Sequence, residues 1–348
     1  MVLTWRTATE RALYGPDGFF VRPDDGPSSH FRTSVHASGQ FATAIVRLLH
    51  EVDTALHHPD AVDLVDVGAG RGELLGQVLS LVENDPTDSS ALRRRLHLTA
   101  VERAPRPAGL PAGITWQAEL PVGSVGLVVA NEWLDDVPLD VVQLDGARWR
   151  VVLVDPEDGS EQLGPPVDPA DAQWLTTWWP TDQAQAGDRA EVGRPRDECW
   201  ARVVGSLDRG LALAIDYAHA RADRAARRWS TGTLVAYRHG RLVAPVPDGS
   251  CDLTAHVALD ACAAAGRTAG ATDTRLTTQR TALLALGLDA ARPALARATT
   301  DPRGYLADLT RAGEVGELVE RTGLGSFGWL LQAKDVDLPA ALRPARPD

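Results

Sequence analysis

The stretch that decides the fold is Leu64-Val65-Asp66-Val67-Gly68-Ala69-Gly70-Arg71-Gly72-Glu73-Leu74-Leu75. An apolar run leads to an acid, a turn with three glycines follows, and apolar residues then recur with helical spacing. This order predicts a buried strand, a tight loop and the start of a helix. In doubly wound α/β folds, such a loop binds a nucleotide-type ligand.

The spacing of the glycines narrows the class of ligand. Gly68, Gly70 and Gly72 carry no side chain, so a ligand can approach the backbone closely. A dinucleotide fingerprint has its third glycine one position later, where this chain has Glu73. A ligand without phosphates, such as S-adenosylmethionine (SAM), therefore fits better than a nicotinamide cofactor. The alternative is a turn that needs glycine only for its own backbone angles.

Composition and charge exclude several classes of partner. The chain has 348 residues, 44% of them apolar, and a net charge of −12, which argues against nucleic acid bound through a basic face. The scattered Cys199, Cys251 and Cys262 indicate neither a disulfide framework nor a zinc site, so we expect no metal. Residues 1–11 lack the apolar core of a signal peptide, and no apolar run is long enough to cross a membrane. We therefore expect a cytoplasmic enzyme without a membrane partner.

Strands that alternate with helices predict a doubly wound α/β sheet. The helix that starts near residue 198 is expected to stop at Gly210, in the position of a C′ glycine. The expected strands cover 62–67, 96–102, 114–116, 125–130, 211–217 and 328–334, and the expected helices cover 42–52, 73–82, 198–207, 257–265 and 278–287.

The pattern changes after residue 139. Asp145-Gly146 between two strand-like runs predicts a β-hairpin over 140–154. Residues 156–196, rich in Pro, Gly, Asp and Gln, are typical of an insertion, with a short apolar helix at 174–179. The Pro- and Ala-rich end of the chain is expected to fray. The resulting division has an N-terminal segment and helices covering the cofactor (1–60), a SAM-binding core (61–139 and 197–335), an inserted hairpin and helical region (140–196) and a tail (336–348).

Acidic residues at strand ends are candidates for holding SAM. Asp66 ends the first strand beside the glycine loop, where it can hold the ammonium group of SAM or brace the loop. Glu102 closes the second strand, where a carboxylate can accept hydrogen bonds from both ribose hydroxyls. Glu119, just past the third strand, is a weaker candidate for the adenine amino group.

A second acidic loop, Asn131-Glu132-Trp133-Leu134-Asp135-Asp136-Val137-Pro138, follows the fourth strand. It therefore lies at the carboxyl edge of the sheet, where doubly wound folds bind ligands. Carboxylates beside SAM can hold a cationic acceptor such as a guanidinium and aim its nitrogen at the methyl group. The alternative is an acidic helix start, which Asp135 and Asp136 would stabilise.

Three distal residues join the candidates. Asp216 and Tyr217 end the fifth core strand at the ligand-binding edge, although Tyr217 also suits a core position. His256 is a candidate general base, because the unperturbed pKa of a histidine suits that role. Because Asp252-Leu253-Thr254 is typical of a helix start, we favour a bracing role for His256 over a catalytic one.

Taken together, these stretches resemble the MidA/NDUFAF7 family of class I SAM-dependent methyltransferases. The resemblance runs from about residue 14 to residue 333, so it covers nearly the whole chain. The matching stretches, in order, are Phe31-Arg32-Thr33-Ser34 with Phe41, Asp66 to Leu74, Asn131 to Pro138, Ile215-Asp216-Tyr217, Gly232 to Tyr237, and Asp252 to Val257.

The resemblance implies a Rossmann-like class I fold with a seven-stranded, mainly parallel sheet, helices on both faces and an inserted β-hairpin and helical substrate region. It also implies a protein arginine methyltransferase, as in mitochondrial members that modify a subunit of respiratory complex I. A protein substrate is then the expected partner, and we allow for a homodimer. Methylation of a small molecule, or a non-catalytic assembly factor that keeps the fold, are the alternatives.

The resemblance also assigns roles to residues. Glu132 and Asp135 would be the catalytic carboxylates on the acceptor side, and the departures from the family pattern are Ser29-His30, His36 and Trp133 to Asp136. Because these departures fall beside the expected cofactor and acceptor, the substrate can differ from that of the family. The cofactor-binding set is Thr33, Ser34, Asp66, Gly68, Ala69, Gly70, Gly72, Glu102, Glu119 and Asn131, and the substrate-binding set is Trp133, Asp136, Asp216, Tyr217 and His256.

Overall fold

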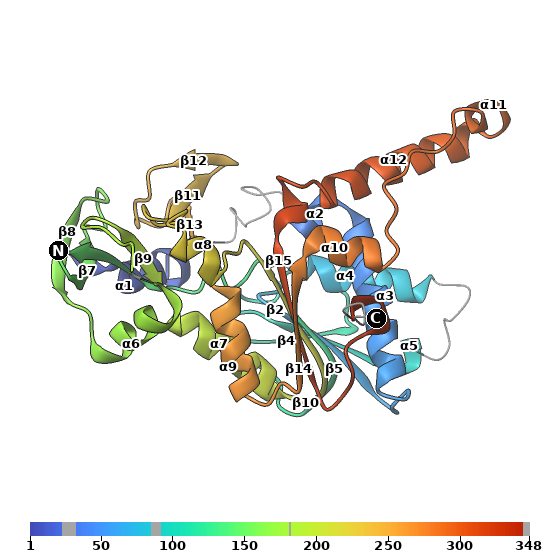
Figure 1. Cartoon of the computed structure of the whole chain (residues 1–348). Helices are drawn as coiled ribbons and strands as arrows, with labels where there is room; N and C mark the ends of the chain where they lie inside the picture. The colour runs from blue at the N-terminus through green and yellow to red at the C-terminus, as the bar shows by residue number, and fades with distance from the viewer. Residues whose placement is uncertain (23–32, 85–91, 181, 344–348) are drawn as a thin grey trace. The chain divides into compact units, whose positions relative to one another are not determined.

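The computed structural model describes residues 1–22, 33–84, 92–180 and 182–343, and it divides into two compact units (Figure 1). Unit 1 comprises Met1–Phe31, Glu132–Gly205 and Asp216–Gly270. Unit 2 comprises Arg32–Asn131, Ser206–Ile215 and Ala271–Asp348. The predicted insertion, 140–196, lies within unit 1, whereas the predicted SAM-binding core contributes to both units.

Unit 2 contains a seven-stranded sheet in the order β14-β15-β10-β5-β2-β3-β4. The pairs from β10 to β4 are parallel, and β14 and β15 are antiparallel, so the expected mainly parallel sheet is confirmed. β14 was not among the expected strands. The strands are β2 (Val62–Val67), β3 (Leu96–Val101), β4 (Ile114–Gln117), β5 (Ser124–Asn131), β10 (Leu207–Asp216), β14 (Asp273–Thr278) and β15 (Gly328–Lys334).

The strand order reverses between β2 and β5. From β2 the chain adds β3 and then β4 on one side, and β5 and β10 extend the sheet on the other. Open α/β sheets bind ligands beyond the carboxyl ends of the strands at such a switch point. The glycine loop follows β2 and Asn131 ends β5, so both lie at this edge.

Two glycines allow the central strands to approach. Gly210 lies inside β10, so its predicted place as a helix C′ residue is wrong; the helix ends at Ser206 and β10 begins at once. Gly210 and Gly126 have φ of 138° and 152°. A Cβ on Gly126 would collide with the carbonyl oxygen of Asp63, and one on Gly210 with that of Gly126. These positions require glycine for close packing as well as for conformation.

The two longest helices of unit 2, α3 and α12, begin with side-chain caps. The Ser38 hydroxyl accepts a hydrogen bond from the Gln40 N–H at the start of α3, and Asp301 caps α12, which has Pro302 in its first turn. The end of the chain is packed through Leu342, which is fully buried, so the expectation of fraying from residue 338 is wrong for the described part. The helices are α2 (Ser34–Ala37), α3 (Gly39–Ala55), α4 (Glu73–Glu83), α5 (Leu92–Arg95), α10 (Gln279–Ala285), α11 (Arg297–Thr300) and α12 (Pro302–Leu318), with 3-10 turns at Leu324–Ser326 and Ala340–Leu342.

Unit 1 contains a five-stranded antiparallel sheet in which β1, β7, β6 and β9 are neighbours and β8 also pairs with β7. The predicted hairpin is confirmed, with Asp145 opposite Arg148 across a turn where Gly146 has φ of 61°. The predicted insertion contains two strands that were not expected, and its helix begins at Pro169 instead of Trp174. The strands are β1 (Leu3–Thr4), β6 (Asp140–Asp145), β7 (Arg148–Val154), β8 (Glu161–Pro166) and β9 (Arg189–Val192).

Each face of this sheet has its own apolar core. Val141 packs with residues of α1 (Trp5–Tyr14) and of a small sheet, whereas the next residue, Val142, packs with α6 (Pro169–Trp178) and α9 (Leu259–Thr268). This alternation is what a strand buried on both sides requires. The small sheet has the order β12-β11-β13, with β11 (Val235–Arg238), β12 (Arg241–Val243) and β13 (Asp252–Thr254); the remaining helices are α7 (Arg194–Ser206) and α8 (Arg221–Ala225).

Candidate functional site

The glycine loop of unit 2 combines strained backbone with open space. Gly68, Gly70 and Gly72 have φ of 73°, 58° and 80°, so the turn does need glycine for its backbone angles. At Gly70, a Cβ would meet only the Glu73 Oε2 atom, at 3.5 Å. At Gly72, it would meet Leu110 Cδ1 at 2.6 Å. The protein therefore packs against Gly72 but leaves room beside Gly70, which is where a ligand could lie.

Two carboxylates flank this loop. Glu102 accepts hydrogen bonds from the Gly70 N–H at 3.1 Å and the Ala104 N–H at 3.0 Å. Asp66 is 4% exposed. Burial, together with the charges of Glu73 and Glu102, raises the pKa of Asp66 to about 7. An opposing positive charge would restore the ionised form of Asp66.

His36, one of the departures from the family pattern, links α2 to the loop. His36 Nδ1 lies 2.6 Å from the Thr33 hydroxyl, and His36 Nε2 lies 3.3 Å from Glu73 Oε1. The other Glu73 oxygen accepts the Arg71 N–H at 2.9 Å. Burial raises the pKa of Glu73. The hydrogen bonds from His36 and the backbone together lower that pKa by more, so the net shift is downward. The departure from the family pattern at His36 thus braces the loop.

The remaining cofactor candidates of unit 2 differ in their surroundings. Ser34 is buried, with its hydroxyl 3.3 Å from Gln279 Oε1, whereas Glu119 lies exposed just beyond β4. Ala69 is buried in the loop itself, and Asn131 is half-buried at the end of β5. The expected residues Ser29, His30, Phe31 and Arg32 lie outside the described residues.

The acidic loop of unit 1 begins with a strained residue. Glu132 has φ of 50°, a left-handed conformation that costs a residue with a side chain about 1 kcal/mol or more. The loop continues into β6 without forming a helix, so the alternative of an acidic helix start is wrong. Strained backbone of this kind concentrates at functional sites. Trp133 lies half-buried beside Glu132.

Asp216 holds this loop in place. Its side chain accepts hydrogen bonds from the N–H groups of Leu134 at 2.9 Å, Asp135 at 3.2 Å and Tyr217 at 2.9 Å. Asp216 is fully buried, and its pKa is raised well above the usual value by that burial and by the Asp135 charge. It therefore positions the acidic loop.

Three more carboxyl groups interact electrostatically nearby: Asp135 and Asp136 each interact with Asp216, and Asp252 interacts with Asp135 and Asp136. Burial, followed by the neighbouring carboxylates, raises the pKa of both Asp136 and Asp252. Asp135 also has a raised pKa because of burial, and its Oδ2 accepts a hydrogen bond from the Thr254 hydroxyl at 2.7 Å. Within the described residues, no group of His, Cys, Asp or Glu side chains is arranged to hold a metal ion.

The cation inside the cluster is Arg196 of α7, which is 2% exposed. Its guanidinium donates to the carbonyl oxygens of Ala255 at 2.7 Å, His256 at 3.1 Å and Val137 at 3.1 Å, and also to that of Asp135. Arg196 thus ties the acidic loop to the segment that follows β13.

Replacing Arg196 by methionine is expected to lower the free energy of unfolding by about 3 kcal/mol, because several buried carbonyls and carboxylates would lose their cation. Urea unfolding of the variant measures this loss. Arg202→Met, on an exposed part of the same helix, is the matched control and should change stability by no more than about 0.5 kcal/mol. Equal stability of the two variants would contradict the bracing role.

Aromatic rings lie next to the acidic cluster. The ring of Tyr217 stacks on His256 at a centroid distance of 5.9 Å, and Trp229 meets His256 edge-on at 4.7 Å. The expected helix start at Asp252-Leu253-Thr254 is wrong: these residues form β13, and α9 begins at Leu259 with no side-chain cap. His256 therefore belongs to a ring cluster and does not cap a helix.

A family model described as "Putative S-adenosyl-L-methionine-dependent methyltransferase" matches residues 42–277, which is more than half of the chain. This chain belongs to that family. The methyltransferase family model spans both the glycine loop of unit 2 and the acidic loop of unit 1, so the resemblance in the motifs is confirmed. SAM is the cofactor of this methyltransferase family.

Individual relatives agree with the family. A Drosophila melanogaster protein named protein arginine methyltransferase NDUFAF7 homolog, mitochondrial, is 29% identical over 282 residues, which cover 69% of this chain but only 61% of the fly protein. A Burkholderia thailandensis protein crystallised with S-adenosyl-homocysteine is 27% identical, with a TM-score of 0.79 over 99% of this chain and 92% of that chain. A native crystal structure from the same organism gives 26% identity and a TM-score of 0.76 over 99% of this chain and 91% of that chain.

Proposed function

We propose that this chain transfers a methyl group from SAM to a nitrogen of an arginine side chain in a protein. The observation that carries the proposal is the group of Asp135, Asp216 and Asp252, which are buried, and Asp136, which is half-buried, in unit 1; the buried cation in contact with this group is Arg196. Such an excess of carboxylates favours a cationic acceptor. The name of the fly relative supports a protein arginine as that acceptor.

The proposed cofactor contacts follow from the geometry of unit 2. Asp66 would hold the ammonium group of SAM, and the backbone of Gly68, Ala69, Gly70 and Gly72 would lie along its methionine part. Each oxygen of Glu102 has a second lone pair, so Glu102 can accept the ribose hydroxyls and still bind the loop. Glu119 would meet the adenine, and Thr33, Ser34 and Asn131 complete the proposed set.

The proposed acceptor contacts follow from the chemistry of methyl transfer. A bond forms between a guanidinium nitrogen and the methyl carbon while the sulfur–carbon bond of SAM breaks, and the nitrogen must lose a proton. Glu132 and Asp135 would hold the guanidinium, aim its nitrogen and accept that proton. Trp133, Asp136, Tyr217 and His256 would surround the group, and Asp216 would act by positioning the loop.

Incubation with methyl-labelled SAM and cell extract, followed by analysis of the labelled product, distinguishes between the possible acceptors. We expect label in protein, recovered as methylarginine after hydrolysis. Label in small molecules alone would replace the protein by a small-molecule acceptor. A complete lack of labelled product would favour a non-catalytic assembly factor.

The location and the assembly of the chain are the last parts of the proposal. We propose a cytoplasmic enzyme that works without nucleic acid and forms a homodimer, although the fly relative is named as mitochondrial. In the part of the chain that the structure describes, no helix is long and apolar enough to cross a membrane.

The affinity for SAM is expected to depend on pH through Asp66. Because the pKa of Asp66 is about 7 without ligand, the carboxyl is protonated below that pH and must ionise to bind an ammonium group. The dissociation constant of SAM should therefore rise about tenfold for each pH unit below 7. Calorimetric titration between pH 5.5 and 8.5 measures it, and Asp66→Asn should bind SAM weakly with no such slope. If the dissociation constant of SAM for Asp66→Asn depended on pH as steeply as it does for the wild type, the ionisation would belong to another group.

A further inference from the structure

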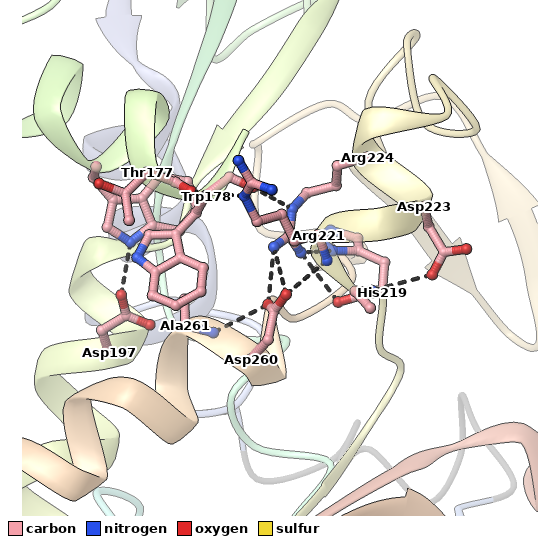
Figure 2. A network of polar contacts seen from close by, with 11 residues as sticks. Thr177, Trp178, Asp197, His219, Arg221, Asp223, Arg224, Asp260 and Ala261 are labelled. Carbon is pink, nitrogen blue, oxygen red and sulfur yellow. Dashed lines mark hydrogen bonds and ion pairs between the residues drawn. The ribbon is translucent and has the colours of Figure 1, made fainter. Parts of the chain in front are cut away.

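A buried arginine, Arg224, fixes the orientation of His219 in unit 1 (Figure 2). Arg224, on α8, is 2% exposed, and its Nη2 donates to both oxygens of Asp260 at 2.8 and 2.9 Å. Its Nε donates to the carbonyl oxygen of Trp178 at 2.7 Å. Its Nη1 donates to His219, to the carbonyl oxygen at 3.1 Å and to ring Nδ1 at 2.7 Å. The guanidinium carbon also lies 5.7 Å from the centroid of the Trp179 ring.

This contact determines where the imidazole of His219 carries its hydrogen. A guanidinium only donates hydrogen bonds, so Nδ1 must accept and cannot be protonated. The neutral ring then carries its hydrogen on Nε2. Burial and the charge of Arg224 lower the pKa of His219 to about 3, so the ring stays neutral at physiological pH. His219 Nε2–H is therefore a fixed hydrogen-bond donor.

That donor has no partner among the described residues, and it is not alone. His219 is 5% exposed, and its Nε2, Trp229 Nε1 and His256 Nδ1 are all buried without a hydrogen-bond partner. The three rings lie within 6.3 Å of one another, measured between centroids. Buried polar atoms normally have partners, so three unpartnered nitrogens in one ring cluster indicate a ligand position. Trp229 and His256 are themselves only partly buried.

The chemistry of these atoms determines what they can bind. The indole nitrogen of Trp229 and Nε2 of His219 are both donors, so the ligand must present an acceptor oxygen. The charge of Arg224 is matched by Asp260, and the nearby carboxylates make a second anion unfavourable. A neutral carbonyl oxygen meets both conditions.

We propose that His219 Nε2–H and Trp229 Nε1–H bind a backbone amide carbonyl of the arginine substrate. This inference rests on the proposed function, and it makes the two residues determinants of specificity: a peptide arginine would be preferred over a guanidinium without a neighbouring amide. An ordered water in the same position is the competing explanation.

The test compares two probes that share the guanidinium. N-acetylarginine methylamide carries neutral amide carbonyls, and methylguanidine carries none. In the presence of S-adenosyl-homocysteine, we expect the wild-type chain to bind the amide at least tenfold more tightly. Trp229→Phe and His219→Leu should each remove most of that preference without changing the affinity for methylguanidine, and His219→Gln, which restores an N–H donor, should recover part of it.

The outcomes separate this inference from the proposed function. If methylguanidine binds but the variants keep the full preference for the amide, the donors do not bind the carbonyl and the inference is wrong. If neither probe binds, the proposed arginine acceptor is wrong, and the inference, which depends on that acceptor, is wrong too. A second measurement needs no activity: in a crystal structure with N-acetylarginine methylamide, the amide carbonyl oxygen should lie within hydrogen-bond distance of both nitrogens. A water in that position, with the amide bound elsewhere, would contradict the inference.

Discussion

Replacing Gly70 by valine is expected to weaken SAM binding about 10³-fold, or about 4 kcal/mol, while the protein stays folded. A side chain here meets only the Glu73 Oε2 atom, at 3.5 Å, so it would fill the space proposed for the methionine part of SAM. Its backbone cost at φ of 58° is about 1–2 kcal/mol, which a domain of this size tolerates. Isothermal titration with SAM measures the affinity, and urea unfolding measures the stability.

A matched control separates the ligand from the backbone strain. Gly146, in the hairpin turn between β6 and β7, has φ of 61°, and a Cβ there would meet nothing within 4 Å. Gly146→Val therefore carries the same strain and should keep wild-type SAM affinity. If Gly70→Val bound SAM as tightly as Gly146→Val does, the glycine loop would not be the cofactor site.

Replacing Glu132 by glutamine is expected to lower kcat for methyl transfer about 10³-fold with little change in SAM affinity. Glutamine keeps the size and the backbone strain of Glu132 but loses the charge that would hold a guanidinium and take up its proton. Transfer from methyl-labelled SAM under single-turnover conditions measures the rate, and titration with SAM shows whether the cofactor site is intact. A rate within threefold of wild type would remove Glu132 from the catalytic set.

The strain at Glu132 gives an independent readout. Glu132→Gly relieves a φ of 50°, so it should raise the free energy of unfolding by about 1 kcal/mol while methyl transfer is lost. Such opposite effects indicate that the strain is retained for function. Glu157→Gln, on the exposed β7–β8 connection, is the control and should change neither quantity.

The parts of the fold that could be predicted from sequence are those with strong local signals. The apolar runs of β2 and β15 gave their residue ranges, and Asp145-Gly146 gave the hairpin. β14 was missed because its residues, Asp273–Thr278, are mostly polar and at least partly exposed. α12 was missed because Ala312, Val315 and Leu318 are its only buried residues among 17, which leaves a weak helical pattern.

The candidate site also contains parts that could be predicted from sequence and parts that could not. The glycine loop and the acidic loop could be found because each is continuous in sequence. Arg196 could not be found from the sequence, because its partners Val137 and Ala255 lie 59 residues away on either side. Only the tertiary fold brings these three residues together. His219 and Trp229 carry no motif; the local signal for His219 is its contact with Arg224, five residues later.

The most direct measurement for the central claim is a crystal structure of this chain grown with S-adenosyl-homocysteine. The account predicts the methionine part along the backbone of Gly68 to Gly72, its ammonium group within hydrogen-bond distance of Asp66, and its ribose hydroxyls on Glu102. Electron density for the ligand at another position, with the space beside Gly70 closed by protein side chains, would contradict it.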